Sequence, residues 1–299
     1  MTPPISVTGL TRRYRGHLAL DNVTFDAQDG VITGLLGRNG AGKTTLMKII
    51  TGQEFASAGD VRVFGTNPVE NDAVLRRMVF VREDQIYPDF KVGHLLRTAS
   101  RFYPDWSDEL ADTLLADFDL PAGRPVKKLS RGMRSAVGII IGLAARAELT
   151  LFDEPYAGLD AVARQVFYDR LLADYAAYPR TVLLSTHLID ETAGLLERVL
   201  VMDKGHVVLD AMADDLRGVA TRVSGPALAV DEFTAGHPVW DSRRMGSQAS
   251  VVVVGHLAEP DRAPAMAGRL TLEPLSLQEL VVHAAGRPGP DAQMMRTSA

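Results

Sequence analysis

The sequence predicts an α/β fold, in which a mostly parallel sheet is covered by helices, followed by a small C-terminal α+β appendage. Over the first two thirds of the 299-residue chain, compact apolar runs alternate with segments of helical spacing. Such runs are typical of strands that are buried on both faces of a parallel sheet. After about residue 210, glycine, proline and alanine become more frequent and the regular alternation stops.

Four apolar runs are the predicted strands of the parallel sheet. They are VITGLL (31–36), LTLF (149–152), TVLLS (181–185) and RVLVMD (198–203). A helix is expected from Lys43 to about Ile50, directly after the glycine-rich loop that follows the first run.

The spacing of apolar residues becomes helical over residues 72–123. Ser107 is predicted to cap a helix that begins SDELADTLLADF, because acidic residues follow it in the first turn. This block is inserted between the glycine-rich loop and LTLF. We therefore expect a helical subdomain over about residues 72–147, within a domain of residues 1–210.

The last third of the chain indicates a separate small unit. SVVVVG (250–255) and RLTLE (269–273) are predicted strands. Leu277, Leu280, Val281 and Ala284 then follow at the spacing of one helix face. We expect an α+β appendage over residues 211–285 and a tail without fixed structure over residues 286–299.

The composition is that of an ordinary globular protein, with 46% hydrophobic and 23% charged residues. A net charge of −5 argues against a general attraction to nucleic acid, and no nucleic-acid partner is expected. The chain has no cysteine, which excludes disulfides and thiolate metal sites. Its longest apolar run, residues 137–145, is far shorter than the roughly 20 residues that span a bilayer.

The stretch GLLGRNGAGKTTL (34–46) predicts a nucleotide site, because it contains the pattern G-x-x-x-x-G-K-[ST] between a predicted strand and a predicted helix. Backbone N–H groups of such a loop cradle phosphate, Lys43 adds a positive charge for the β- and γ-phosphates, and the Thr44 hydroxyl binds Mg²⁺. The expected contacts are Gly37, Arg38, Asn39, Gly40, Ala41, Gly42, Lys43, Thr44 and Thr45.

The run LTLFDEP predicts the second half of the hydrolytic site. It ends a strand with Asp153 and Glu154, at the edge where α/β sheets place their sites. Asp153 is expected to hold Mg²⁺ together with Thr44. Glu154 is expected to polarise the attacking water.

The order GRNGAGKTT, LSRGM, LFDEP, GLD and STH is similar to that of the ATP-binding subunits of ABC transporters, over about residues 5–210. The resemblance implies an ABC-type P-loop ATPase domain with an inserted helical subdomain. It also implies that ATP and Mg²⁺ bind between two such subunits arranged head to tail, as a homodimer or a heterodimer. A separate membrane-spanning permease is the implied partner, which places the chain at the cytoplasmic face of the membrane.

LSRGM resembles the ABC signature, whose common form is LSGGQ. The resemblance implies that this motif contacts the ATP of the second subunit, with Ser130 and the Gly132 N–H at a helix start forming an anion site. Arg131 and Met133 depart from the common Gly and Gln, in a manner similar to exporter-type ATPases. The whole motif is Leu129, Ser130, Arg131, Gly132 and Met133.

Further roles follow from the same resemblance. The segment of Gly158, Leu159 and Asp160 resembles the D-loop, which touches the site of the partner subunit. His187 resembles the switch histidine, which contacts the γ-phosphate and completes a catalytic set with Glu154 and Lys43. Tyr14 resembles the aromatic residue that stacks on adenine, a contact that discriminates weakly between bases.

One loop departs from the family pattern. VREDQIYP (81–88) lies where the family usually has a glutamine that senses Mg²⁺ and the attacking water. Counting back from KVGHLL places Glu83 at that position, and Gln85, two residues further on, is the alternative.

The sequence therefore favours an ATPase that powers transport through a separate membrane partner, with export preferred over import. A soluble ABC ATPase acting in translation or DNA maintenance is the alternative. The transported substrate and the role of residues 211–299 are not determined by the sequence.

Overall fold

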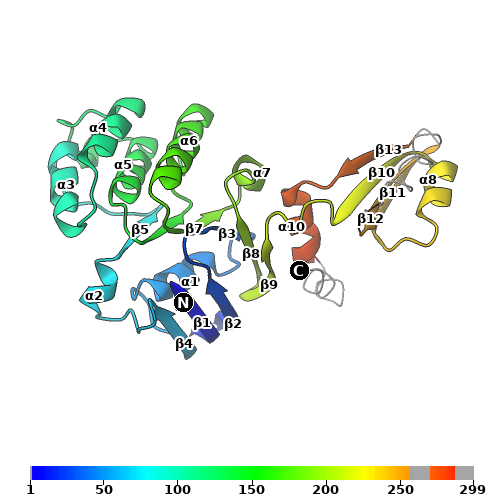
Figure 1. Cartoon of the computed structure of the whole chain (residues 1–299), viewed down its shortest axis with the longest axis horizontal. Coiled ribbons are helices and arrows are strands. Elements are labelled where there is room, and N and C mark those ends of the chain that lie inside the picture. Colours follow the sequence, from blue (N-terminus) through cyan, green and yellow to red (C-terminus); the bar gives the residue numbers. More distant parts are fainter. Residues whose placement is uncertain (1, 256, 258–269, 287–299) are drawn as a thin grey trace.

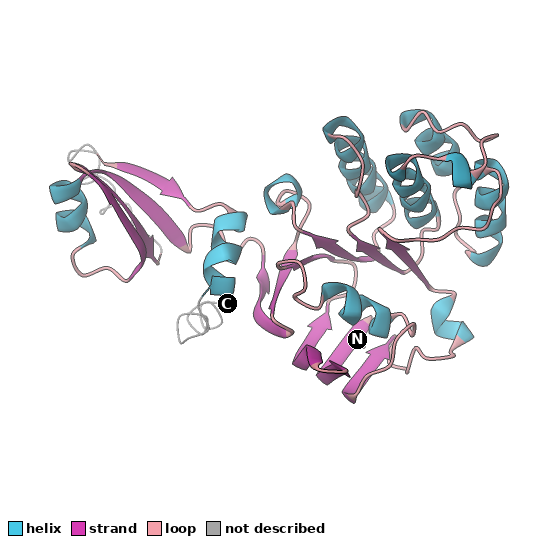
Figure 2. Cartoon of the chain, turned by 180° about the vertical axis from the view of Figure 1, so that it is seen from behind, coloured by secondary structure: helices cyan, strands magenta, loops and turns pink. Residues whose placement is uncertain are grey.

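The computed structural model describes residues 2–255, 257 and 270–286, and its centre is a six-stranded sheet (Figures 1 and 2). In spatial order the strands are β5 (Met78–Arg82), β6 (Leu149–Asp153), β7 (Thr181–Thr186), β3 (Ile32–Leu36), β8 (Arg198–Asp203) and β9 (His206–Met212). The first five are parallel, and β9 returns antiparallel beside β8. The predicted α/β fold is confirmed, and the four predicted strands begin and end within one residue of β3, β6, β7 and β8.

Strand β5 corrects the sequence analysis, which expected only helical structure between residues 72 and 123. The run MVFVR joins the edge of the central sheet, where Met78 pairs with Leu149. A five-residue run is too short to reveal its partner, and the pairing with β6 is made about 70 residues away along the chain. Within residues 72–123, the only helix before β5 is the four-residue α2 (Asp72–Leu75). The larger helices of this block begin after β5.

Two different layers cover the two faces of the central sheet (Figure 1). On one face lie α1 (Lys43–Ile50) and an antiparallel sheet that the sequence analysis did not anticipate. Its strands, in spatial order, are β2 (His17–Ala27), β1 (Ile5–Tyr14) and β4 (Ala58–Val63). Bulges interrupt the register of β1 against both neighbours, which blurs the alternation that would have predicted it.

The other face is covered by helices. They are α3 (Val92–Ala99), α4 (Asp108–Asp117), α5 (Arg131–Ala144) and α6 (Ala161–Ala177), with 3₁₀ turns at Ser100–Phe102 and Val126–Lys128 and the short α7 (Ile189–Thr192). The predicted cap of α4 is confirmed, because the Ser107 side chain accepts the Leu110 N–H. No helix in the described part of the chain combines the length and the apolar composition needed to cross a bilayer.

A second antiparallel sheet follows β9. In spatial order its strands are β11 (Val239–Met245), β12 (Gln248–Val254), β10 (Ala220–Pro226) and β13 (Thr271–Pro274), with α8 (Ala227–Thr234) on one face. The predicted C-terminal helix is α10 (Leu277–Gly286), which packs against β8, β9 and α7 and so joins this unit to the core (Figure 1). Strand β9 extends to Met212, two residues past the expected boundary at 210. Residues 287–299 of the expected tail lie outside the described residues.

A buried charge cluster fastens α6 to the sheet. Asp174 and Arg180 have side chains that are only 4% and 3% exposed, and their charged atoms lie 2.8 Å apart. The same carboxylate accepts hydrogen bonds from Arg146, at 2.9 and 3.1 Å. Burial lowers the pKa of Arg180, and the neighbouring carboxylate of Asp174 opposes that shift.

Replacing Asp174 with alanine is expected to lower the free energy of unfolding by about 3 kcal/mol, because it leaves a buried guanidinium without its counter-ion. Denaturant unfolding followed by circular dichroism measures this loss. Asp169→Ala is the matched control on the same helix, since Asp169 is exposed and bonds to Gln165. Equal stability of the two variants would contradict the assignment.

Candidate functional site

The glycine-rich loop lies between the end of β3 and the start of α1. Gly42 precedes the helix with a φ of 105°, and a Cβ there would lie 2.5 Å from the Ala19 carbonyl oxygen, so the position requires glycine. Lys43 is buried, and its ammonium group donates to the carbonyls of Gly37 at 2.7 Å and Arg38 at 3.3 Å. These two hydrogen bonds connect the lysine side chain to the main chain of its own loop.

This loop forms one wall of a pocket of about 350 Å³. The pocket is lined by Tyr14, His17, Ala19, Asn39, Gly40, Ala41, Gly42, Lys43, Thr44, Thr45, Glu83, Asp153 and Glu154. Most of the sequence-predicted nucleotide contacts are therefore together, whereas Gly37 and Arg38 do not line the pocket. His17 and Ala19 were not predicted, because nothing in the sequence indicated that β2 passes beside the loop.

Two carboxylates stand at the end of β6 in this pocket. Asp153 is 5% exposed, and one of its oxygens, Oδ1, is buried without a hydrogen-bond partner among the described residues. Glu154 also has a buried oxygen, Oε1, with no hydrogen-bond partner in the part of the chain that the structure describes. Its φ of 49° is unusual for a residue other than glycine. Burial lowers the pKa of Lys43, and the negative charges of Glu154 and Asp153 oppose that shift.

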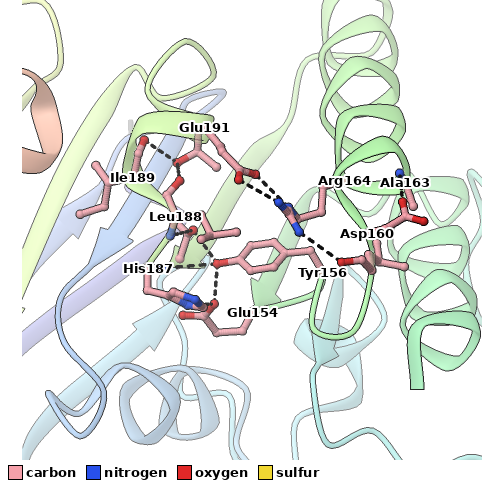
Figure 3. A network of polar contacts seen from close by, with 12 residues as sticks. Glu154, Tyr156, Asp160, Ala163, Arg164, His187, Leu188, Ile189 and Glu191 are labelled. Atoms are coloured by element: carbon pink, nitrogen blue, oxygen red, sulfur yellow. Dashed lines mark hydrogen bonds and ion pairs between the residues drawn. The ribbon is translucent and has the colours of Figure 1, made fainter. Parts of the chain in front are cut away.

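The second Glu154 oxygen belongs to a polar network that reaches β7 (Figure 3). It lies 2.7 Å from Nδ1 of His187, the residue that directly follows β7. It also accepts a short hydrogen bond from the hydroxyl of Tyr156. Tyr156 was not predicted as a site residue, and its place two positions after Glu154 was the only signal in the sequence.

The LSRGM segment lies outside this pocket. Leu129 is buried, and Ser130 caps α5 by accepting the Met133 N–H at 3.2 Å. Gly132 lies against the carbonyl of Gly158, so that a Cβ on Gly132 would clash with it. The structure thus brings LSRGM and the GLD segment together, and no residue of either segment lines the pocket.

The GLD segment turns from the acidic pair into α6. Leu159 is half-buried against the core, and Asp160 caps the helix by accepting the Ala163 N–H at 2.8 Å. Gly158 also contacts the side chain of Arg131.

Glu83 connects the pocket to LSRGM. It directly follows β5, and its N–H donates to the Asp153 carbonyl at 3.1 Å. Its carboxylate forms an ion pair with Arg131, the first residue of α5. Gln85 and Glu83 both line a neighbouring cleft of about 500 Å³, together with Arg131 and Arg134, and of these two residues Glu83 also lines the pocket beside the glycine-rich loop.

Tyr14 stands at the rim of the pocket with a partly exposed ring. The guanidinium of Arg12 lies 4.5 Å from the ring centroid, and the Tyr14 hydroxyl donates to Glu54 at 3.2 Å. Arg12 and Glu54 are themselves paired at 2.6 Å. These contacts hold the ring at the C-terminal end of β1.

Comparison with known proteins identifies the family of the chain. A family model described as ABC transporter matches residues 20–157. The Nod factor export ATP-binding protein I of Ralstonia nicotianae is 32% identical over 222 residues, which cover 72% of this chain and 69% of the relative. The chain belongs to the ABC transporter family. Its family and fold class, expected from the motif series, are confirmed.

Solved structures place this ABC transporter subunit among ATP-binding cassettes. The structure of an ATP-binding subunit of an ABC transporter is 26% identical, with a TM-score of 0.64, and covers 71% of this chain and 91% of its own. A dimeric bacterial ABC transporter cassette has the same fold, with a TM-score of 0.61 at 23% identity over 70% of this chain and 98% of its own. The protein is an ATPase that acts as a subunit of a transporter.

Because Glu83 pairs with Arg131, we expect the effects of substituting these two residues on ATP affinity to be coupled. Arg131→Ala is expected to weaken ATP binding about tenfold, because an uncompensated carboxylate then faces the phosphates. The double variant Glu83→Gln/Arg131→Ala is expected to recover the affinity of the wild type. Titration with a fluorescent ATP analogue measures both.

Arg134→Ala is the control for this cycle, because Arg134 lines the same cleft on the same helix. Its affinity should stay within twofold of the wild type. If the loss of ATP affinity in the double variant equals the product of the losses in the two single variants, the pairing is contradicted.

Proposed function

We propose that this subunit powers export through a separate membrane-spanning partner, by ATP-driven closure of two ATP-binding subunits. The observation that carries the proposal is the incomplete site of the single chain. The loop and the acidic pair line one pocket and His187 is bonded to Glu154, while the exposed Ser130 and the half-buried Gly132 lie outside that pocket. A second subunit that supplies its LSRGM segment would complete each pocket.

Magnesium fits the donor set of the pocket. Asp153 has an unpaired buried oxygen and Thr44 an exposed hydroxyl-bearing side chain, and oxygen ligands of this kind are the ones that Mg²⁺ prefers. These two residues would hold the ion, which supplies neutralisation of phosphate charge when bound. Lys43, now bonded to loop carbonyls, would donate to the β- and γ-phosphates.

Glu154 is the proposed base for hydrolysis. Its Oε1 is buried without a hydrogen-bond partner among the described residues and would accept a hydrogen bond from the attacking water, while Oε2 is held by Tyr156 and His187. His187 is 54% exposed, so its ring can reach a γ-phosphate as well as Glu154. Tyr14 would stack on adenine at the rim, and Glu83 would take the place of the usual glutamine.

The second subunit is proposed to be an identical or related chain arranged head to tail. Ser130 and the N-terminus of α5 would then bind the γ-phosphate on the opposite chain, since exposed N–H groups at a helix start favour anions. Gly158, Leu159 and Asp160 lie beside that segment and would face the same partner site. The shared fold with a dimeric cassette supports this arrangement.

The membrane partner is proposed to bind at the cytoplasmic face, in the cleft beside Glu83. That cleft is lined by Gln85, by the 89% exposed Ile86 and by residues that begin α5. An exposed apolar side chain in a cleft is typical of a protein-binding surface. The similarity to the Nod factor export ATP-binding protein I of Ralstonia nicotianae supports export for this chain.

Glu154→Gln is expected to reduce ATP turnover at least 100-fold and to preserve ATP binding, because the amide keeps the shape but does not accept a proton. Size-exclusion chromatography with ATP should show a trapped dimer. Glu148→Gln, on the surface at the opposite end of β6, is the control and should hydrolyse ATP normally. Normal hydrolysis by the Glu154 variant would remove the basis of the proposal.

A tagged chain isolated from membranes of its own host is expected to bring down a protein with many membrane-spanning segments. Ile86→Asp should lose that partner and keep ATP binding, because the change places a charge in the cleft. Phe102→Asp is the control, because it places the same charge at another exposed apolar side chain, in the 3₁₀ turn Ser100–Phe102 and outside the cleft. Recovery of ribosomes or DNA alone would favour a soluble ATPase instead.

A further inference from the structure

The hydroxyl of Tyr156 connects two loops of the site and has its full complement of hydrogen bonds. Its residue is 3% exposed, and three hydrogen-bond partners surround the hydroxyl oxygen (Figure 3). They are the Glu154 carboxylate, the Thr186 hydroxyl at 2.6 Å and the His187 N–H at 3.2 Å. A phenol has one proton and two acceptor positions, so these three partners use its whole capacity.

The direction of each bond follows from the chemistry of the partners. A carboxylate only accepts, so the single phenolic proton goes to Glu154. The His187 N–H only donates, and Thr186 must therefore donate its own proton to the phenol. The Thr186 oxygen is then free to accept the Leu188 N–H, which lies 2.9 Å away.

From this arrangement we propose that Tyr156 is a positioning residue for ATP hydrolysis. Its hydroxyl fixes Oε2 of Glu154 and the main chain of His187 at the same point, which leaves Oε1 of Glu154 for the attacking water. The inference rests on the proposed function, in which Glu154 is the base and His187 contacts the nucleotide. Tyr156 itself does not line the nucleotide pocket.

A second contact braces the other end of the same loop. Arg164 on α6 forms two hydrogen bonds of 2.9 Å with Glu191 on α7, and it donates to the Leu159 carbonyl at 3.2 Å (Figure 3). The loop from Glu154 to Asp160 is therefore tied at both ends to the segment that follows β7. Within this frame, Tyr156 is the contact closest to the reacting groups.

A neighbouring tyrosine, Tyr168, serves as a comparison for the Tyr156 hydroxyl. Tyr168 on α6 is also 3% exposed, and its ring centroid lies 6.5 Å from that of Tyr156. The Tyr168 hydroxyl is buried, but it has no hydrogen-bond partner among the described residues. The two tyrosines therefore share burial and packing and differ in what their hydroxyls do.

The experiment compares Tyr156→Phe with Tyr168→Phe in the full-length chain. Tyr156→Phe is expected to lower kcat for ATP at least tenfold, with KM for ATP and the affinity for a fluorescent ATP analogue within twofold of wild type. Tyr168→Phe should leave all three values within twofold. A kcat for Tyr156→Phe that equals that of Tyr168→Phe, or a loss that appears only in KM, overturns the inference.

Thr186→Val provides an independent test, because it removes the proton that the phenol accepts and preserves the size of the side chain. It should lower kcat, and the double variant with Tyr156→Phe should lose less than the product of the two single losses. Multiplying losses overturn the inference. Normal hydrolysis by Glu154→Gln would instead overturn the proposed function, so the two failures are distinct.

Discussion

The parallel pairing of β5, β6, β7 and β3 is the constraint on which the site depends. Each strand ends at the same edge of the sheet, and each is followed at once by a site segment. Glu83 follows β5, the acidic pair stands at the end of β6, His187 follows β7, and the glycine-rich loop follows β3. A shift of any one register would separate groups that now lie within hydrogen-bond distance.

The same edge gathers charge that needs compensation. Glu83, Asp153 and Glu154 line one pocket with a single buried lysine, so a bound polyphosphate would add to an excess of negative charge. Two contacts from outside the pocket relieve part of it, since Arg131 pairs with Glu83 and Tyr156 donates to Glu154. The remaining unpaired carboxylate oxygens are where a cation and a water molecule would find partners.

The fold could be predicted where local pattern and tertiary role agree. The buried strands β3, β6, β7 and β8 are short apolar runs, and the Ser107 cap lies before an acidic turn. The prediction was wrong at β5, whose five residues carry no sign of their distant partner, and it missed the bulged β1. Of the predicted site residues, most of those in the glycine-rich loop and both of the acidic pair line one pocket. His17 and Tyr156 were not predicted, because they reach this region only through tertiary contacts.

The sequence by itself determined the chemistry of this protein, because a phosphate loop and an acidic strand end consist of neighbouring residues whose types and spacing are readable. Only the tertiary structure decided how those parts are held. Arg131 and Glu83 are 48 residues apart, and the hydroxyls of Tyr156 and Thr186 meet across 30 residues. Hydrogen bonds between residues so far apart in the sequence depend on the order of the strands in the sheet. Nothing in either local segment specifies the partner.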